Sequence, residues 1–148
     1  EVLIAARAMH AGLDVVKPLL AEKDVKPVGT VVLGTVKGDL HDIGKNLVGM
    51  MLEGAGFKVI DLGIDVAPEK FVDAVKNNDV DVIAMSALLT TTMVNMEKIT
   101  KEIKDAVPGT LVTIGGAPVN NDFCSKIGAD HYSPDPQGVV EYLNAKFA

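Results

Sequence analysis

The residues with the clearest chemical potential are Asp39 and His41, which lie close together in a glycine-containing segment, residues 38–44. An imidazole that binds a metal through one nitrogen usually donates its other N–H to a carboxylate, which fixes the orientation of the ring. One histidine and one aspartate are too few ligands for a zinc site. The pair also suits a helix start, in which Asp39 caps the helix, Asp42 favours its first turn and His41 is a solvated loop residue. The segment alone does not decide between these interpretations.

An alternation of apolar runs and amphipathic patterns from Val28 onwards must position this segment. It predicts strands and helices in turn: strands at 28–34, 58–61, 80–85, 111–114 and 131–132, and helices at 42–54, 68–77, 92–107, 119–127 and 136–146. Such an alternation with short connections predicts an α/β, flavodoxin-like (Rossmann-like), doubly wound five-stranded parallel sheet in the order 2-1-3-4-5. Ligands bind beyond the carboxyl ends of such strands, so the loops after Gly34, Met85 and Ile114 should form the site.

Two of these loops add small groups to the candidate site. Ser86, Ala87 and Leu88 follow the third predicted strand, and Gly115, Gly116 and Ala117 follow the fourth. Taken separately, a serine at a strand end is an ordinary turn former and a glycine pair permits a tight backbone. Taken together with His41, they outline a narrow slot that suits a flat ring system inserted edgewise.

Known phosphate sites do not match the first loop. Gly34, Gly38 and Gly44 lie between a strand and a helix, but their spacing fits neither the P-loop nor the dinucleotide pattern Gly-x-Gly-x-x-Gly. A receiver domain, which shares this sheet, needs a phosphorylatable aspartate where Ser86 stands.

Residues 1–27 are predicted to form a separate element. Apolar residues recur every three or four positions from Leu3 to Leu20, which predicts two short amphipathic helices or one helix kinked at Gly12 and Pro18. The sequence opens inside this pattern without a capping residue. We therefore expect a helical domain of which only the last part is present, joined by a lysine-rich linker at residues 21–27.

Composition limits the partners. The 148 residues carry a net charge of −6 with an estimated pI of 4.9, and they have no basic cluster with interleaved aromatic residues. Nucleic acid and anionic membranes are therefore not expected as partners. The single cysteine, Cys124, is expected to be buried, and it excludes an internal disulfide. No membrane-length apolar run or signal peptide is visible, which predicts a cytoplasmic protein.

The three loops together resemble the cobalamin-binding domain of corrinoid proteins. This family includes the corrinoid module of methionine synthase and the small corrinoid partners of anaerobic methyltransferases. Here Asp39-x-His41-x-x-Gly44 is followed by 41 residues, Ser86-x-Leu88, 26 residues and Gly115-Gly116. Every element and both spacings fit the family fingerprint. The resemblance runs from Val28 to the C-terminus, and the opening helix resembles the last part of the four-helix cap of the methyl-carrying branch. It divides the chain into a cap and linker, 1–27, and a cobalamin-binding domain, 28–148.

The resemblance implies cobalamin or a related cobamide as the cofactor, with its own lower base detached from cobalt. His41 would be the axial cobalt ligand, and Asp39 would accept its N–H; these two are the candidate catalytic residues. Ser86 would meet the buried base. Thr92 stands where methionine synthase has a serine that extends the relay, although it also suits a helix cap. The remaining implied cofactor-binding residues are Gly38, Asp42, Ile43, Gly44, Leu88, Thr90, Gly115, Gly116 and Ala117. Tyr132 suits the cofactor tail or the core equally, and His131 is expected to be an exposed loop residue.

The implied function is that of a methyl carrier and not of an enzyme. Its partners would be methyltransferases, one that delivers the methyl group to cobalt and one that passes it to tetrahydrofolate or a thiol, together with a reductive activator. Methyl loss should release His41, and the His41–Asp39 pair should then take up a proton. The alternatives are the cobalamin domain of an adenosylcobalamin-dependent mutase and a cobalamin-dependent sensor, which would need an attached signalling domain.

Overall fold

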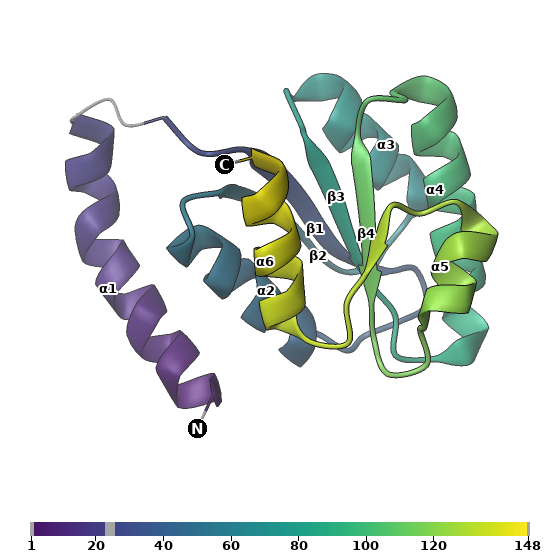
Figure 1. Ribbon diagram of the computed structural model, residues 1–148, viewed down its shortest axis with the longest axis horizontal. Coiled ribbons are helices and arrows are strands. Elements are labelled where there is room, and N and C mark those ends of the chain that lie inside the picture. Colours follow the sequence, from purple (N-terminus) through teal and green to yellow (C-terminus); the bar gives the residue numbers. More distant parts are fainter. Residues whose placement is uncertain (1, 23–25, 148) are drawn as a thin grey trace.

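A five-stranded parallel sheet forms the centre of the computed structural model, which describes residues 2–22 and 26–147 (Figure 1). Its strands are β1 (Thr30–Val36), β2 (Lys58–Val66), β3 (Val82–Ser86), β4 (Leu111–Gly115) and β5 (His131–Tyr132). Their order in the sheet is β2-β1-β3-β4-β5, and all neighbours are parallel. The predicted topology is confirmed, and the order of the strands reverses between β1 and β3.

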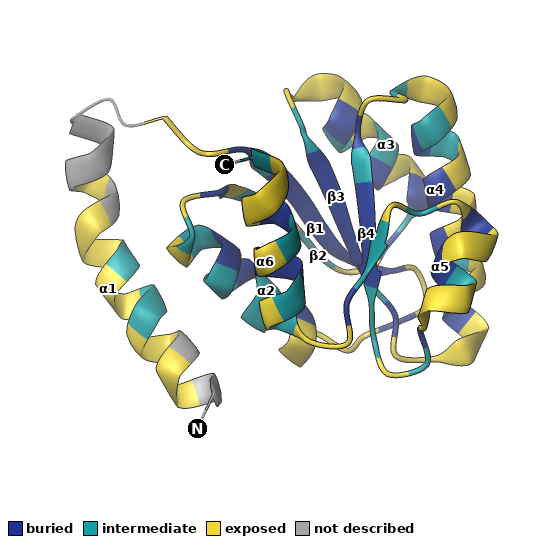
Figure 2. Cartoon of the chain, in the orientation of Figure 1, coloured by how far each residue is buried: buried dark blue, intermediate teal, exposed yellow. Residues whose placement is uncertain are grey.

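Helices cover both faces of the sheet. They are α2 (Ile43–Gly54), α3 (Pro68–Asn77), α4 (Val94–Ala106), α5 (Asn121–Ile127) and α6 (Pro136–Phe147), with a short 3-10 helix, η1, at Thr90–Thr92. One core cluster joins α2 and α6 to the sheet, and the other joins α3, α4 and α5 to the opposite face. Buried residues are concentrated on the strands and on the helix surfaces that face them (Figure 2).

Alternating side chains of the strands supply the two clusters. In β3, Val82 and Ala84 face α2 and α6, whereas Ile83 and Met85 face the other layer. Alternation of this kind follows from the two-residue period of a strand. Cys124 of α5 is buried in the second cluster, as the sequence predicts.

The helix α1 (Val2–Glu22) lies outside these layers and packs beside α2 (Figure 1). It is one continuous helix, with Pro18 inside it, rather than two short ones. Met9 of α1 lies so close to Gly54 of α2 that a Cβ at Gly54 would overlap its sulfur. Residues 23–25 of the predicted linker lie outside the described residues. No helix in the described part of the chain has the length and apolarity to cross a membrane.

The first two strands end later than predicted, which corrects the position of the loop. Gly34, predicted as the end of β1, lies inside the strand, where a Cβ would come within 2.8 Å of the Phe71 ring. Its role is therefore close packing. β2 continues to Val66 by pairing with Val36 after two register shifts, an irregularity that apolar periodicity does not reveal.

Two helix starts also differ from the prediction. The helix predicted at residues 92–107 begins only at Val94, as α4, because Thr92 is the last residue of the separate 3-10 helix η1. The helix predicted from residue 119 begins at Asn121 because the Asn120 side chain caps it by accepting the Phe123 N–H at 2.8 Å. Both differences shift the ends of loops without changing the architecture.

Candidate functional site

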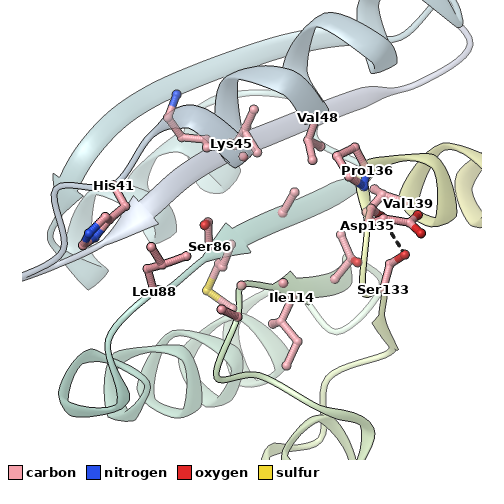
Figure 3. A pocket seen from close by; sticks show the side chains of 18 of the residues that line it. His41, Lys45, Val48, Ser86, Leu88, Ile114, Ser133, Asp135, Pro136 and Val139 are labelled. Carbon is pink, nitrogen blue, oxygen red and sulfur yellow. Dashed lines mark hydrogen bonds between the residues drawn. The ribbon is translucent and has the colours of Figure 1, made fainter. Parts of the chain in front are cut away.

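A cavity of about 610 Å³ lies where the carboxyl ends of β1, β3 and β4 meet, between α2 and α6 (Figure 3). Most of the predicted site residues line it: His41, Asp42, Ile43, Gly44, Ser86, Leu88, Gly115, Gly116 and Ala117. Gly38, Asp39 and Thr92 do not line the cavity. Thr90 is exposed on η1 and also lies outside the lining.

Asp39 is fully buried and accepts hydrogen bonds with both oxygens. Its Oδ1 lies 2.7 Å from His41 Nδ1 and 3.1 Å from the His41 backbone nitrogen. Its Oδ2 accepts the N–H groups of Leu88 and Leu89, at 2.7 and 3.2 Å, and the Thr92 hydroxyl at 3.0 Å. One carboxylate therefore joins the loop after β1 to the loop after β3.

These hydrogen bonds determine the charge of Asp39. Burial by itself raises the pKa of the carboxyl group, but hydrogen bonds from the Leu88 N–H, the His41 ring and backbone, and the Thr92 hydroxyl outweigh it. The resulting pKa is well below the ordinary value for an aspartate. Asp39 is therefore an ionised acceptor at neutral pH, and His41 Nδ1 carries the proton that it accepts.

His41 is held on one side and open on the other. Its side chain is 50% exposed, and its Nε2 has no hydrogen-bond partner among the described residues. With the proton on Nδ1, the lone pair is on Nε2. The Thr35 hydroxyl, which is fully buried, donates to the carbonyl oxygen of His41 at 2.8 Å. The hydrogen bonds to Thr35 and Asp39 therefore fix both the backbone and the ring of His41.

The helix-cap interpretation of this segment is wrong. The residue that precedes α2 is Asp42, and its side chain makes no capping hydrogen bond. Asp39 faces β3 instead, because the loop after β1 continues for several residues before the helix begins. Thr92 likewise does not cap α4, whose first flanking residue is Met93. Its hydroxyl lies within hydrogen-bond distance of Asp39 Oδ2 and of the Leu89 carbonyl, at 3.0 and 2.9 Å.

Sequence reasoning missed three supporting residues. Asp65, at φ +50, accepts the Gly38 N–H at 2.7 Å and donates its own N–H to the Asp39 carbonyl at 3.0 Å. Lys45 is only 3% exposed and forms an ion pair with Asp61 at 2.7 Å. Thr35, which holds His41, is the third. A lysine at a helix start and a threonine in a strand give no sequence signal, because their usual roles are solvation and packing.

The structure contradicts the prediction for His131 and is consistent with both predicted roles of Tyr132. His131 is not an exposed loop residue: its ring stacks on Tyr142 of α6, with centroids 3.9 Å apart. Burial lowers the pKa of His131. Tyr132 both lines the cavity and packs against the second core cluster, so neither of its two predicted roles excludes the other.

The glycines of the site differ in whether the fold itself requires a glycine at that position. Gly116, at φ +129, adopts a conformation that side chains disfavour, and a Cβ there would overlap the Ala87 carbonyl oxygen. A Cβ at Gly115 would make only an ordinary contact, 3.6 Å from the Ser133 carbonyl oxygen, and one at Gly44 would meet nothing within 4 Å. The protein itself therefore requires Gly116, but it does not require Gly115 or Gly44.

A corrinoid fits these residues. Its macrocycle supplies most of the cobalt ligands, so the protein would need to add only one, for which a single histidine would be enough. The half-exposed His41 offers Nε2, the cavity beside it has room for a ring, and two glycines at its edge leave space that the protein does not fill.

Comparison with known proteins identifies the family. A family profile described as the B12 binding domain matches residues 29–138. This chain belongs to the B12-binding domain family. The trimethylamine corrinoid protein 1 of Methanosarcina mazei is 47% identical over 149 residues, which cover 98% of this chain and 69% of that protein. The chain binds cobalamin or a related corrinoid.

Solved structures agree with this assignment of the B12-binding chain. A cobalamin-binding protein from Desulfitobacterium hafniense has a TM-score of 0.83 and 36% identity, covering 97% of this chain and 68% of that one. A chain of the methanol:cobalamin methyltransferase complex MtaBC from Methanosarcina barkeri has a TM-score of 0.79 and 33% identity, covering 82% of this chain and 47% of that one.

Replacing Asp39 by asparagine should destabilise the ligand-free B12-binding chain by about 1–3 kcal/mol at neutral pH, because an amide cannot satisfy the same donors. The folded pKa is depressed, so the carboxylate stabilises the fold above its unfolded pKa of about 4, and this contribution is lost as pH falls further. The difference in unfolding free energy between wild type and D39N should therefore be constant from neutral to mildly acidic pH and shrink in stronger acid. Urea titrations across this range measure it.

The exposed neighbour Asp42 provides the control. D42N should unfold like the wild type, since that side chain makes no capping bond. A D39N deficit that persists undiminished in strong acid would contradict the ionised role of Asp39.

The two adjacent glycines should respond differently to alanine. G116A should lose about 1–3 kcal/mol of stability, since it combines an unfavourable φ with a backbone overlap. G115A should stay within about 0.5 kcal/mol of the wild type. Thermal unfolding of the ligand-free proteins compares them, and equal stability of the two variants would show that the close approach at Gly116 is not decisive.

Proposed function

We propose that this corrinoid protein carries a methyl group between partner methyltransferases, with its corrinoid held base-off and with His41 as the cobalt ligand. The observation that carries the proposal is the orientation of His41. Asp39 accepts the Nδ1 proton at 2.7 Å, which leaves the Nε2 lone pair toward the open side. A metal-bound histidine typically has this arrangement, because the supporting carboxylate fixes the tautomer and raises the basicity of the ligating nitrogen.

When bound, the corrinoid supplies a cobalt ion that accepts and releases a methyl group. The chain's own contribution is orientation. The Asp39 carboxylate would hold the His41 ring in place also when the imidazole is not engaged, since the two groups are in hydrogen-bond contact.

The cavity between α2 and α6 would hold the detached lower base and its nucleotide tail. Ser86 would meet the base, and Leu88 and the residues 115–117 would line its path. Asp42, Ile43 and Gly44 would lie against the corrin ring. Ile43 is 73% exposed, which is unusual for a large apolar side chain and consistent with a surface that a ligand covers.

Methyltransferases are the proposed partners. The relative in MtaBC is part of a methanol:cobalamin methyltransferase complex. Other relatives are named as trimethylamine corrinoid proteins, which makes a methylamine the first methyl donor to test. The acceptor would be tetrahydrofolate or a thiol, and a reductive activator would restore oxidised cobalt. The chain itself would carry the group and not turn over substrate.

We also infer that residues 1–27 are the last part of a helical cap with its linker, and that 28–148 form the corrinoid domain. The position of α1 outside the layers supports this division. So do its exposed apolar side chains, of which Ile4 and Val15 are each 71% exposed.

Replacing His41 by alanine tests the cobalt ligand. H41A should still bind a corrinoid through the cavity but show an altered absorption spectrum and slow methyl exchange with a partner methyltransferase. H10A, in the remote helix α1, is the matched control and should keep the wild-type spectrum. A wild-type spectrum of H41A at every pH would exclude His41 as the ligand.

Replacing Gly44 by alanine separates folding from binding. Because nothing lies near a Cβ there, G44A should make the ligand-free protein up to about 1 kcal/mol more stable through helix propensity. The same methyl group should obstruct the corrin ring and weaken binding by about tenfold or more, equivalent to about 1.4 kcal/mol. Denaturant unfolding and corrinoid titration measure the two effects.

Gly12 of α1 is the matched control, because it is also helical and also open. G12A should gain stability without losing affinity. Unchanged affinity in G44A would contradict the proposed position of the corrin ring.

A further inference from the structure

The walls of the cavity between α2 and α6 are mostly aliphatic. Across its floor, Leu33 of β1 pairs in register with Ala84 of β3, which pairs with Thr113 of β4. Val48 of α2 and Val139 of α6 add branched side chains (Figure 3). A ring that enters this cavity exchanges water mainly for hydrocarbon.

Most polar side chains on the wall already have partners. Lys45 Nζ donates to Asp61 at 2.7 Å. The Ser133 hydroxyl donates to the carbonyl oxygen of Asp135 at 2.8 Å. Asp135 is exposed to solvent, and its carboxylate accepts the Gly138 N–H at 2.8 Å. These groups are therefore committed to the fold.

Three hydroxyl groups of the lining residues are left for a ligand. Ser86 Oγ has no hydrogen-bond partner among the described residues and faces the cavity. Thr113 Oγ1 lies 3.3 Å from His131 Nδ1 and keeps further hydrogen-bonding capacity. Tyr132 also lines the cavity, and its hydroxyl has no hydrogen-bond partner among the described residues. The side chains of the wall can thus satisfy one ring nitrogen at Ser86 and only a few further polar groups, through Thr113 and Tyr132.

We propose that this cavity selects corrinoids by the polarity of their lower ring, and that it accepts benzimidazole or phenolic rings in preference to purines. The inference rests on the proposed function, in which the detached lower ring lies in this cavity. Dimethylbenzimidazole, once joined to its ribose, has one free ring nitrogen and otherwise hydrocarbon edges. Adenine brings an exocyclic amine and additional ring nitrogens.

The size of the preference follows from the unsatisfied groups. A polar group buried without a partner costs about 1–3 kcal/mol, so each such group on adenine weakens binding by about fivefold to a hundredfold. A phenolic ring brings no ring nitrogen or amine of its own that would need a partner, although it leaves the Ser86 hydroxyl unsatisfied. We therefore expect the adenine-containing corrinoid to bind at least about tenfold more weakly than the other two.

Three corrinoids that differ only in the lower ring, dimethylbenzimidazole, adenine or cresol, test the preference by absorption or fluorescence titration of the ligand-free protein. Detachment of the lower ring from cobalt costs most for dimethylbenzimidazole, less for adenine and nothing for cresol, which does not bind cobalt. If detachment decided affinity, adenine would rank between the other two. If the polarity of the lower ring decides affinity, the adenine-containing corrinoid should instead bind more weakly than both of the others.

A variant adds a partner for adenine without changing the shape of the cavity. V139T places a hydroxyl on the wall and should raise the affinity for the adenine-containing corrinoid, relative to the dimethylbenzimidazole one, by about tenfold. V140T is the matched control, since Val140 is the next residue of α6 but does not line the cavity. V48T repeats the test from α2 if V139T does not fold. Comparing the ratio of the two affinities between variants cancels the cost of detaching the lower ring from cobalt, because this cost is the same in every variant.

The outcomes are distinct. The inference is supported if the adenine-containing corrinoid binds most weakly and if the ratio of its affinity to that of the dimethylbenzimidazole corrinoid changes in V139T or V48T but not in V140T. The inference is overturned if the adenine-containing corrinoid binds second most tightly or most tightly of the three, or if this ratio of affinities is unchanged in both V139T and V48T. Either result leaves the proposed function intact. Failure of all three corrinoids to bind overturns the proposed function itself.

Discussion

The site depends on one buried carboxylate. Removing Asp39 from water is costly, and the structure offsets this cost with donors from two loops, including the Leu88 and Leu89 N–H groups and the Thr92 hydroxyl. The donors come from the loop after β1 and the loop after β3, so satisfying the charge also determines where these two loops lie. The position of His41 is a consequence, because its backbone and ring are both held by Asp39 Oδ1.

The sheet topology explains why these loops can meet. The strands β1 and β3 are neighbours although β2 lies between them in sequence, and their carboxyl ends open toward the same edge. The end of β2 reaches the same point from the other side, where Asp65 bonds both to Gly38 and to Asp39. The Asp39 loop is therefore held between β2 and β3, while the cavity on its α2 and α6 side stays open.

Much of this arrangement could be predicted from the sequence. Alternating apolar runs predicted the α/β class, since each pattern reports a local period. The strand order was predicted as the usual order of a flavodoxin-like sheet. Most fingerprint residues line the cavity, because their motifs sit at strand ends. What could not be predicted depends on contacts between distant segments: the bulged end of β2, the burial of Lys45 against Asp61, and the stacking of His131 on Tyr142. No local pattern reports such pairings.

The groups that hold Asp39 and His41 all belong to the protein, so His41 does not depend on a ligand to be ordered. A histidine that had to be ordered by its ligand would lose side-chain entropy on association and bind more weakly. Here Thr35, Asp39 and the β3 loop fix the loop and the tautomer of His41 through contacts within the chain itself. The proposed ligand atom, Nε2, would therefore be preorganised, and the free energy of ligation would be available for binding rather than for ordering the loop.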